Sequence, residues 1–380
     1  MHLALSASPN LGFMTMSMTR TFKAIRGWVS PTTRVEVGEI LLQRGDLEFP
    51  ASFLTPVTRN QNLPTWVVLH GLTPSGRFHP TLEQFTRALA SSGAAVLIPE
   101  IPEWTRLEVK PEVTIPTIRA TLKAIKEHPL TNQGPCGLIG FSFGAPQALI
   151  AATKPDIANQ LAGVVSWGGY SDMERILQFQ MTGQHEWQGE EYWLKPDPYG
   201  RWIIAGNYLP FVPEHSDAQD VADALLNLAI EAGNRRIPSL SPSYDTLLTE
   251  LAAGISPERK ELFELFAPRS DQQIDTEKAS RMATRLTESA TKVTPLLNPA
   301  PYLSEVLSEV HLFHGRTDSL IPYTETLLAN TLLPRDKIAS STITGLFEHS
   351  ERGNRLTSVF QEVAEATNLI RALSRVLSIV

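Results

Sequence analysis

The sequence predicts an α/β protein in which helices cover both faces of a mostly parallel sheet. Three observations support this fold class: short apolar runs of strand length, helix-length segments with one apolar face between them, and glycine or proline residues at their boundaries. Strands and helices that alternate along a chain form parallel sheets, because each helix returns the chain to the same edge. The 380 residues are 42% apolar and 19% charged, which is typical of a globular protein with a substantial core.

The first 172 residues contain most of the predicted sheet. Residues 35–42 and 47–54 predict two strands joined by the turn Arg44-Gly45-Asp46. Pro50 predicts that the second of these strands lies at an edge, since proline has no N–H for a ladder hydrogen bond. Four buried strands are predicted at residues 66–69, 94–98, 136–139 and 164–167, and helices near residues 82–93, 118–125 and 144–153.

The alternation breaks after Asp172. Residues 173–300 show helical patterns and no convincing buried strand, and they predict a mainly helical cap or lid inserted after the sixth strand. Eight of the 33 residues 179–211 are aromatic; we interpret them as packing of this cap against the core, and direct contact with a substrate is the alternative. The sheet resumes with strands at residues 310–313 and 340–344. The predicted division is an N-terminal extension (1–34), a core (35–172 and 301–380) and a helical cap (173–300).

Composition excludes several classes of protein. The 33 Lys and Arg against 40 Asp and Glu give a net charge of −7, which disfavours nucleic-acid binding through a general basic field. The single cysteine, Cys136, excludes an internal disulfide and a cysteine-rich zinc site. No run approaches the ~20 apolar residues of a membrane-spanning helix, so we expect a soluble, cytoplasmic protein without stable membrane insertion. Nothing in the sequence indicates an oligomeric state.

The N-terminal residues are basic and poor in acids. We interpret residues 1–34 as a loose extension, and organelle targeting is the alternative. A further hypothesis is docking on a membrane surface through one apolar face made of Phe22, Ile25, Trp28 and Val29.

The motif with the most chemical content is Gly140-Phe141-Ser142-Phe143-Gly144, a G-x-S-x-G run. It directly follows the predicted strand 136–139 and opens a helix. A serine there must sit on a tight, strained turn, and the flanking glycines let strand and helix approach closely. Its hydroxyl then projects at the carboxyl edge of the sheet, beside a helix N-terminus. With this context the chain resembles the α/β-hydrolase fold family over roughly residues 35–172 and 301–380.

Three further features match the family in its usual order. His70-Gly71-Leu72 follows a strand where the family places its oxyanion loop, and His314-Gly315-Arg316-Thr317-Asp318 follows a strand where the family carries its acid. Phe347-Glu348-His349-Ser350 follows the last strand, where the family carries its histidine. Asp172 is the alternative acid, because some members keep the acid after the strand that ends near residue 167. The resemblance gives roles to Ser142, Asp318 and His349 (catalytic triad), to the backbone N–H groups of Leu72 and Phe143 (oxyanion hole), and to His70, Gly71, Gly140 and Gly144 (support).

The resemblance implies a serine hydrolase that cleaves a small carboxylic ester, or a related acyl bond, through an acyl-enzyme. Peptidase, thioesterase and C–C bond hydrolase are alternatives with the same triad, and a non-catalytic binding protein of this fold is another. The serine excludes relatives that use an aspartate nucleophile, such as haloalkane dehalogenases and epoxide hydrolases. The sequence shows no metal-ligand cluster and no glycine-rich phosphate loop, so we expect no cofactor.

Overall fold

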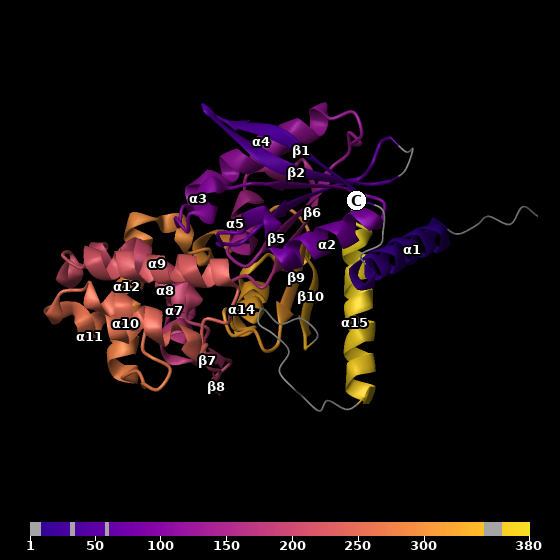
Figure 1. Ribbon diagram of the computed structural model, residues 1–380. Helices are drawn as coiled ribbons and strands as arrows, with labels where there is room; N and C mark the ends of the chain where they lie inside the picture. The colour runs from indigo at the N-terminus through magenta and orange to yellow at the C-terminus, as the bar shows by residue number, and fades with distance from the viewer. Residues whose placement is uncertain (1–8, 31–34, 58–60, 346–358) are drawn as a thin grey trace, which may run out of the picture.

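A computed structural model describes residues 9–30, 35–57, 61–345 and 359–380, with side chains from residue 18 at one end and from residue 367 at the other. Its centre is an eight-stranded sheet in the order β1-β2-β4-β3-β5-β6-β9-β10 (Figure 1). β2 is antiparallel to both of its neighbours, and every other neighbouring pair is parallel. The strands are β1 (Val35–Arg44), β2 (Leu47–Pro56), β3 (Thr65–Leu69), β4 (Ala95–Pro99), β5 (Cys136–Phe141), β6 (Leu161–Trp167), β9 (Val310–Gly315) and β10 (Ile338–Thr344).

Helices cover both faces of this sheet, as the apolar strands require. In β3 the side chains of Val67 and Leu69 belong to one apolar cluster, and those of Trp66 and Val68 belong to another on the opposite face. The fold class predicted from the sequence is therefore confirmed. One face is covered by α1 (Pro9–Val29), α2 (Pro80–Ser91) and α15 (Val359–Leu377), and the other by α4 (Thr114–Glu127), α5 (Gly144–Ala151) and α14 (Thr324–Leu332). Two short helices, α3 (Pro102–Thr105) and α6 (Pro155–Ala158), lie in loops.

The prediction that Pro50 marks an edge strand is wrong. β2 lies between β1 and β4, and the edge strand is β1. The carbonyl of Pro50 accepts the N–H of Glu100 at 2.9 Å, just beyond the end of β4 at Pro99. In an antiparallel strand the N–H and C=O of one residue point to the same side. The missing N–H therefore faces Glu100, which follows the last residue of β4, so the proline interrupts the pairing only at its end.

The N-terminal segment is not loose over its helical part. α1 packs against α2 and α15, and a Cβ added to Gly27 would lie 3.1 Å from the Cα of Ala88 in α2. Phe22 and Val29 are 70% and 76% exposed, whereas Ile25 and Trp28 are half-buried, so the four do not form one exposed face. None of the helices within the described residues has the length and apolar character to span a membrane.

The segment between β6 and β9, here called the insertion, is mainly helical and extends to one side of the sheet (Figure 1). Its pairs α7–α12 and α8–α9 pack against each other. The aromatic residues of 179–211 divide, since Phe179, Trp202 and Tyr208 are buried and Trp193 is 67% exposed. The elements are α7 (Met173–Thr182), the hairpin β7 (Gln184–Trp187) and β8 (Glu190–Trp193), α8 (Tyr199–Tyr208), α9 (Gln219–Arg235), α10 (Asp245–Ala253), α11 (Lys260–Phe266), α12 (Thr276–Val293) and α13 (Ala300–Leu303).

Candidate active site

Ser142 occupies a strained turn between β5 and α5. Its φ is +51°, a region that residues with a Cβ seldom adopt. The turn is held by hydrogen bonds on both sides: the N–H of Ser142 donates to Trp167 O at 2.9 Å, and the N–H of Ala145 donates to Ser142 O at 3.0 Å. A Cβ on Gly140 would lie 2.6 Å from the carbonyl carbon of Gly144. Strand and helix therefore approach as closely as the G-x-S-x-G motif predicted.

The loop after β3 crosses this turn. A Cβ on Gly71 would lie 3.2 Å from the Cβ of Ser142, and one on Gly144 would lie 2.7 Å from the carbonyl oxygen of His70. Any side chain at either glycine would push the loop away from the serine. The structure thus brings together the motif around Ser142 and the His70-Gly71-Leu72 segment, which lie 70 residues apart in the sequence.

His70 is a buried, neutral group that fixes the loop. Its Nε2 accepts the N–H of Ile101 at 3.1 Å, so its Nδ1 carries the proton and donates to Gly71 O at 2.8 Å. The ring packs edge-on against Trp104. Burial, and to a lesser degree the nearby Arg77, lowers the pKa of His70 to about 4. Both ring nitrogens are used, which agrees with a positioning role.

Asp318 lies buried in the loop after β9. Its Oδ1 accepts the N–H groups of Leu320 at 2.9 Å and Ile321 at 3.0 Å, and its Oδ2 is 3.5 Å from Nε2 of His314. His314 is engaged elsewhere, because its Nε2 donates to Ile321 O and its Nδ1 accepts the hydroxyl of Thr326, both at 2.7 Å. These bonds hold the Asp318 carboxylate in one orientation.

Asp172, the alternative acid, caps a helix. Its Oδ1 accepts the N–H groups of Glu174 and Arg175, each at 3.0 Å, at the start of α7. Its own N–H donates to Oε2 of Glu325 at 3.0 Å. A structural role therefore accounts for its position after β6.

Glu325 is a buried carboxylate that the sequence did not indicate. Its fully buried carboxylate accepts the N–H of Ser171 at 2.9 Å and Nε of Arg175 at 2.9 Å. Burial raises the pKa of Glu325, opposed by these donors. It joins α14 of the core to the first turn of the insertion, a contact between residues more than 150 positions apart.

His349, with the residues around it, lies outside the described part of the chain. The strand that precedes it in the sequence is described: β10 ends at Thr344, which pairs with Gly315 of β9. The N–H of Arg316 donates to Thr344 O at 2.7 Å. The chain that leads to His349 therefore departs next to the loop that carries Asp318.

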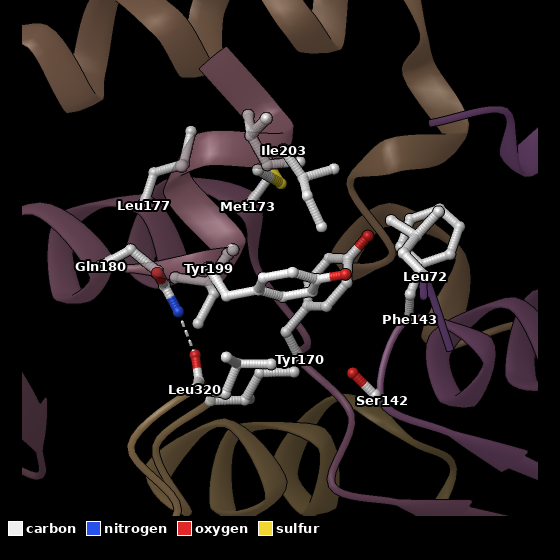
Figure 2. Close-up of a pocket in the computed structure, with 14 residues that line it drawn as sticks. Leu72, Ser142, Phe143, Tyr170, Met173, Leu177, Gln180, Tyr199, Ile203 and Leu320 are labelled. Atoms are coloured by element: carbon white, nitrogen blue, oxygen red, sulfur yellow. Dashed lines mark hydrogen bonds between the residues drawn. The ribbon is translucent and has the colours of Figure 1, made fainter. Parts of the chain in front are cut away.

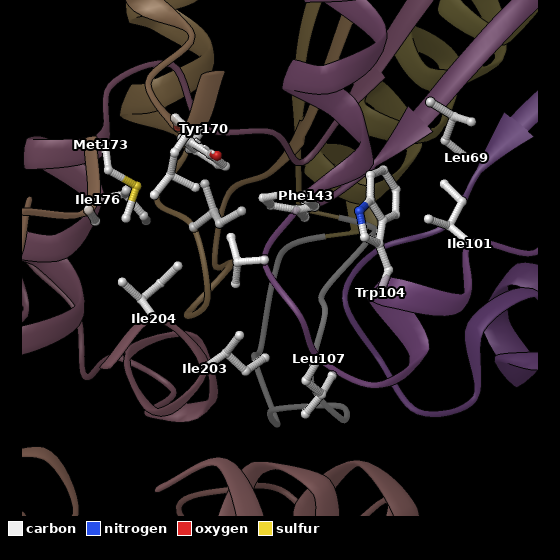
Figure 3. Packing of buried hydrophobic residues seen from close by; sticks show 14 of the residues in the cluster. Leu69, Ile101, Trp104, Leu107, Phe143, Tyr170, Met173, Ile176, Ile203 and Ile204 are labelled. Carbon is white, nitrogen blue, oxygen red and sulfur yellow. Dashed lines mark hydrogen bonds between the residues drawn. The ribbon is translucent and has the colours of Figure 1, made fainter. Parts of the chain in front are cut away.

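A cavity with about 580 Å³ of empty space, part of it open to solvent, lies between the core and the insertion (Figure 2). Ser142 is at its core wall, and no described residue that lines it carries a charge. Phe143 sits between Trp104 and the apolar residues of the insertion (Figure 3), so this wall is continuous with the main core. The lining comes from the core (Leu72, Ser142, Phe143, Leu320, Ile321) and from the insertion (Tyr170, Met173, Ile176, Leu177, Gln180, Tyr199, Gly200, Ile203, Ile204).

Apart from Ser142, the polar residues of this lining were not singled out from the sequence. Tyr170 donates its hydroxyl to Leu297 O at 2.9 Å, and Gln180 bonds Leu320 O and the N–H of Arg201. Tyr199 appeared in the sequence only as one member of the aromatic cluster. Of the eight aromatic residues at 179–211, Tyr199 is the one that lines the cavity, so the enrichment did not point to the site.

The described residues give no support to metal-ion chemistry or to a cysteine nucleophile. Across the described ranges, no group of three His, Cys, Asp or Glu side chains is placed to hold a metal ion. Cys136 is buried in β5, and burial raises the pKa of its thiol to about 12, so it stays protonated.

No family model and no curated protein matches the chain. Among solved structures it is similar to an acylaminoacyl peptidase from Pyrococcus horikoshii, at 12% identity and a TM-score of 0.47, over 92% of this chain and 42% of the peptidase. It is similar to a fungal esterase from Rhizomucor miehei at 13% identity and a TM-score of 0.47, over 96% and 91% of the two chains. Brefeldin A esterase, a bacterial homologue of human hormone-sensitive lipase, matches at 15% identity and a TM-score of 0.46, over 100% and 88%.

The chain thus spans less than half the length of the peptidase. The assignment of the fold rests on the chain's own geometry, because these scores describe only a loose overlap. An eight-stranded sheet with an antiparallel second strand, and a positive-φ serine between β5 and α5, define the α/β-hydrolase fold.

Proposed function

We propose that the chain is a serine hydrolase that cleaves a small carboxylic ester through an acyl-enzyme. One observation carries the proposal: Ser142 lies on a strained strand-to-helix turn and lines a mainly apolar cavity. Backbone strain of this kind costs free energy and persists where the surrounding structure enforces it, commonly at functional sites. The G-x-S-x-G sequence and the close approach of the loop after β3 support the same assignment.

The proposed mechanism assigns one step to each residue. A serine hydroxyl is a weak nucleophile near neutral pH, so His349 removes the Ser142 proton as Oγ attacks the ester carbonyl carbon. Asp318 holds the imidazole in the required tautomer and stabilises the imidazolium. The N–H groups of Leu72 and Phe143 bind the oxyanion. The leaving alcohol takes the proton from His349, and water activated by the same residue then releases the acid.

An ester is favoured over a peptide because of the cavity. Its lining is apolar and uncharged at the described positions, so it suits a neutral acyl or alcohol group and offers no partner for a charged terminus. The insertion would act as a cap that excludes water from the acyl group. A substrate panel with matched p-nitrophenyl esters, anilides and thioesters compares the three bond types directly.

The test is the rate of ester hydrolysis by wild type, Ser142→Ala and His349→Ala. Both variants should lose at least about 10³-fold in kcat. Ser243→Ala, at an exposed serine of the insertion, is the matched control and should keep wild-type kinetics. Equal rates in wild type and Ser142→Ala, with both folded, would remove the assignment.

A further inference from the structure

The hydroxyl of Tyr199 is a buried polar group that makes no hydrogen bond of normal geometry, although the Thr73 hydroxyl lies nearby. Tyr199 begins α8 in the insertion, and its side chain lines the cavity. The hydroxyl oxygen is inaccessible to solvent, and no described group makes a hydrogen bond of normal geometry with it. Burial raises the pKa of Tyr199, only partly opposed by the nearby Thr73 hydroxyl, so the phenol remains protonated and can donate.

The other buried tyrosine hydroxyls are all satisfied. Tyr170 donates to Leu297 O at 2.9 Å, Tyr208 to Val109 O at 2.9 Å, and Tyr244 to Ile237 O at 3.1 Å. Gln180, the remaining polar side chain of the lining, bonds two backbone groups. A buried hydroxyl without a partner destabilises a fold, and each case in a native protein calls for an explanation. Here the ring that carries the unsatisfied hydroxyl lines the proposed substrate cavity.

The hydroxyl lies where the insertion meets the loop after β3. It is 3.0 Å from the position that a Cβ on Gly233 of α9 would take, and that position is 2.5 Å from Cδ of Pro74. The ring extends across the cavity from α8 toward Leu72 on the side that holds Ser142 (Figure 2). A molecule bound over Ser142 would therefore lie against the ring that carries this donor.

We infer that the Tyr199 hydroxyl donates a hydrogen bond to an oxygen of the bound substrate, and that this substrate is an uncharged, mainly apolar ester. The inference rests on the proposed function and names its substrate class. The charge requirement comes from the lining, because a charge moved from water into an apolar cavity without a partner is strongly disfavoured. Tyr199 acts as a positioning residue contributed by the insertion, and Ser142 carries out the chemistry.

The experiment compares wild type with Tyr199→Phe, which keeps the ring and removes only the hydroxyl. Tyr244→Phe is the matched control, since its hydroxyl has a backbone acceptor and lies outside the cavity lining. The substrates are p-nitrophenyl butyrate and pentanoate with the isosteric methoxyacetate and 3-methoxypropanoate, in which an ether oxygen replaces a methylene group. A p-nitrophenyl hemisuccinate ester tests the effect of charge.

For Tyr199→Phe we expect kcat/KM to fall about fivefold to tenfold, the size of one neutral hydrogen bond. A loss for all esters would assign the bond to the ester group, and a loss for the ether esters alone would assign it to a more distant oxygen. The melting temperature should stay the same or rise, because an unsatisfied hydroxyl is removed. Tyr244→Phe should keep wild-type kinetics, and the hemisuccinate should react at least about 100-fold more slowly than pentanoate in every variant.

Unchanged kinetics in Tyr199→Phe would overturn the hydrogen bond, and efficient hydrolysis of the hemisuccinate would overturn the substrate class. Fluorophosphonate labelling separates these failures from failure of the proposed function. Label on Ser142 in both wild type and Tyr199→Phe, with no kinetic difference, rejects only the role of Tyr199. Absence of label in wild type rejects the nucleophile itself.

Discussion

The core and the insertion form opposite walls of one cavity but contribute different groups to it. The core supplies Ser142 on its strained turn, together with Leu320 and Ile321, whose N–H groups hold the buried Asp318 carboxylate. The insertion supplies mainly apolar side chains and the hydroxyl of Tyr199. The chemistry and the shape of the proposed site therefore come from separate parts of the chain. Substitutions in the core should change the rate for every substrate, and those in the insertion should change which substrates react.

The two parts meet at a buried carboxylate. Glu325 of the core accepts hydrogen bonds from Ser171, Asp172 and Arg175 at the start of the insertion. Substitutions in the core, in the insertion and at Glu325 between them can test this division of roles.

The largest expected effect distinguishes the two candidate acids. Asp318→Asn should lower kcat by about 10³- to 10⁴-fold, because the amide would no longer hold the histidine in the required tautomer. Asp172→Asn should retain kcat, since asparagine also caps helices. Steady-state hydrolysis of p-nitrophenyl butyrate measures both. The reverse ranking would place the acid after β6 and remove Asp318 from the proposed triad.

The next effect concerns the junction. Glu325→Ala leaves the N–H groups of Ser171 and Asp172 and the Arg175 guanidinium without their acceptor, and it should lower the free energy of unfolding by about 3–5 kcal/mol. Urea denaturation measures the change, and Glu288→Ala, at an exposed position of the insertion, should stay within about 0.5 kcal/mol of wild type. A loss as small as that of Glu288→Ala would mean that other contacts hold the insertion in place.

The pH dependence of stability tests the loop over Ser142. The pKa of His70 is about 4 in the folded chain and near 6.5 when unfolded, so below pH 6.5 the unfolded state binds the extra proton. The contribution of His70 is therefore present above pH 6.5 and is lost as the pH falls toward 4. Between pH 7.5 and pH 5 the free energy of unfolding of the wild type should fall by about 2 kcal/mol more than that of His70→Gln. Parallel pH profiles for the two proteins would contradict a neutral, buried His70.

The smallest expected effect is the removal of a helix cap. Asp172→Ala should lower the free energy of unfolding by about 1 kcal/mol, because two N–H groups at the start of α7 lose their acceptor. Thermal unfolding measures the change. If kcat also fell by orders of magnitude, Asp172 would belong to the chemistry as well as to the helix.

Local patterns predicted the core better than the insertion. The strand, turn and helix around Ser142 follow from an apolar run and two glycines within nine residues, so the sequence was sufficient. Pro50 led to the wrong prediction of an edge strand. Its strand pairs with β4, whose pairing ends at Pro99, and the sequence near Pro50 does not indicate that partner. Glu325 and Tyr199 matter through contacts between residues far apart in the chain, which no local pattern encodes.

The candidate site was predicted in the same uneven way. Ser142, Gly71 and His70 lie together as expected, and Asp318 has a defined, buried position. Asp172 was an alternative because position after a strand suits both an acid and a helix cap, and only its hydrogen bonds show that it caps α7. The role of His349 stays a prediction, since that residue lies beyond the described ranges.

The most direct test of the central claim is fluorophosphonate labelling of the folded protein, with the modified peptide mapped by mass spectrometry. The probe reacts with an activated serine, not with a merely exposed one. We expect one adduct, on Ser142, which is absent from Ser142→Ala while Ser243→Ala still carries it. A folded wild type that takes no label, or takes it on a different serine, would contradict the assignment of Ser142 as the nucleophile.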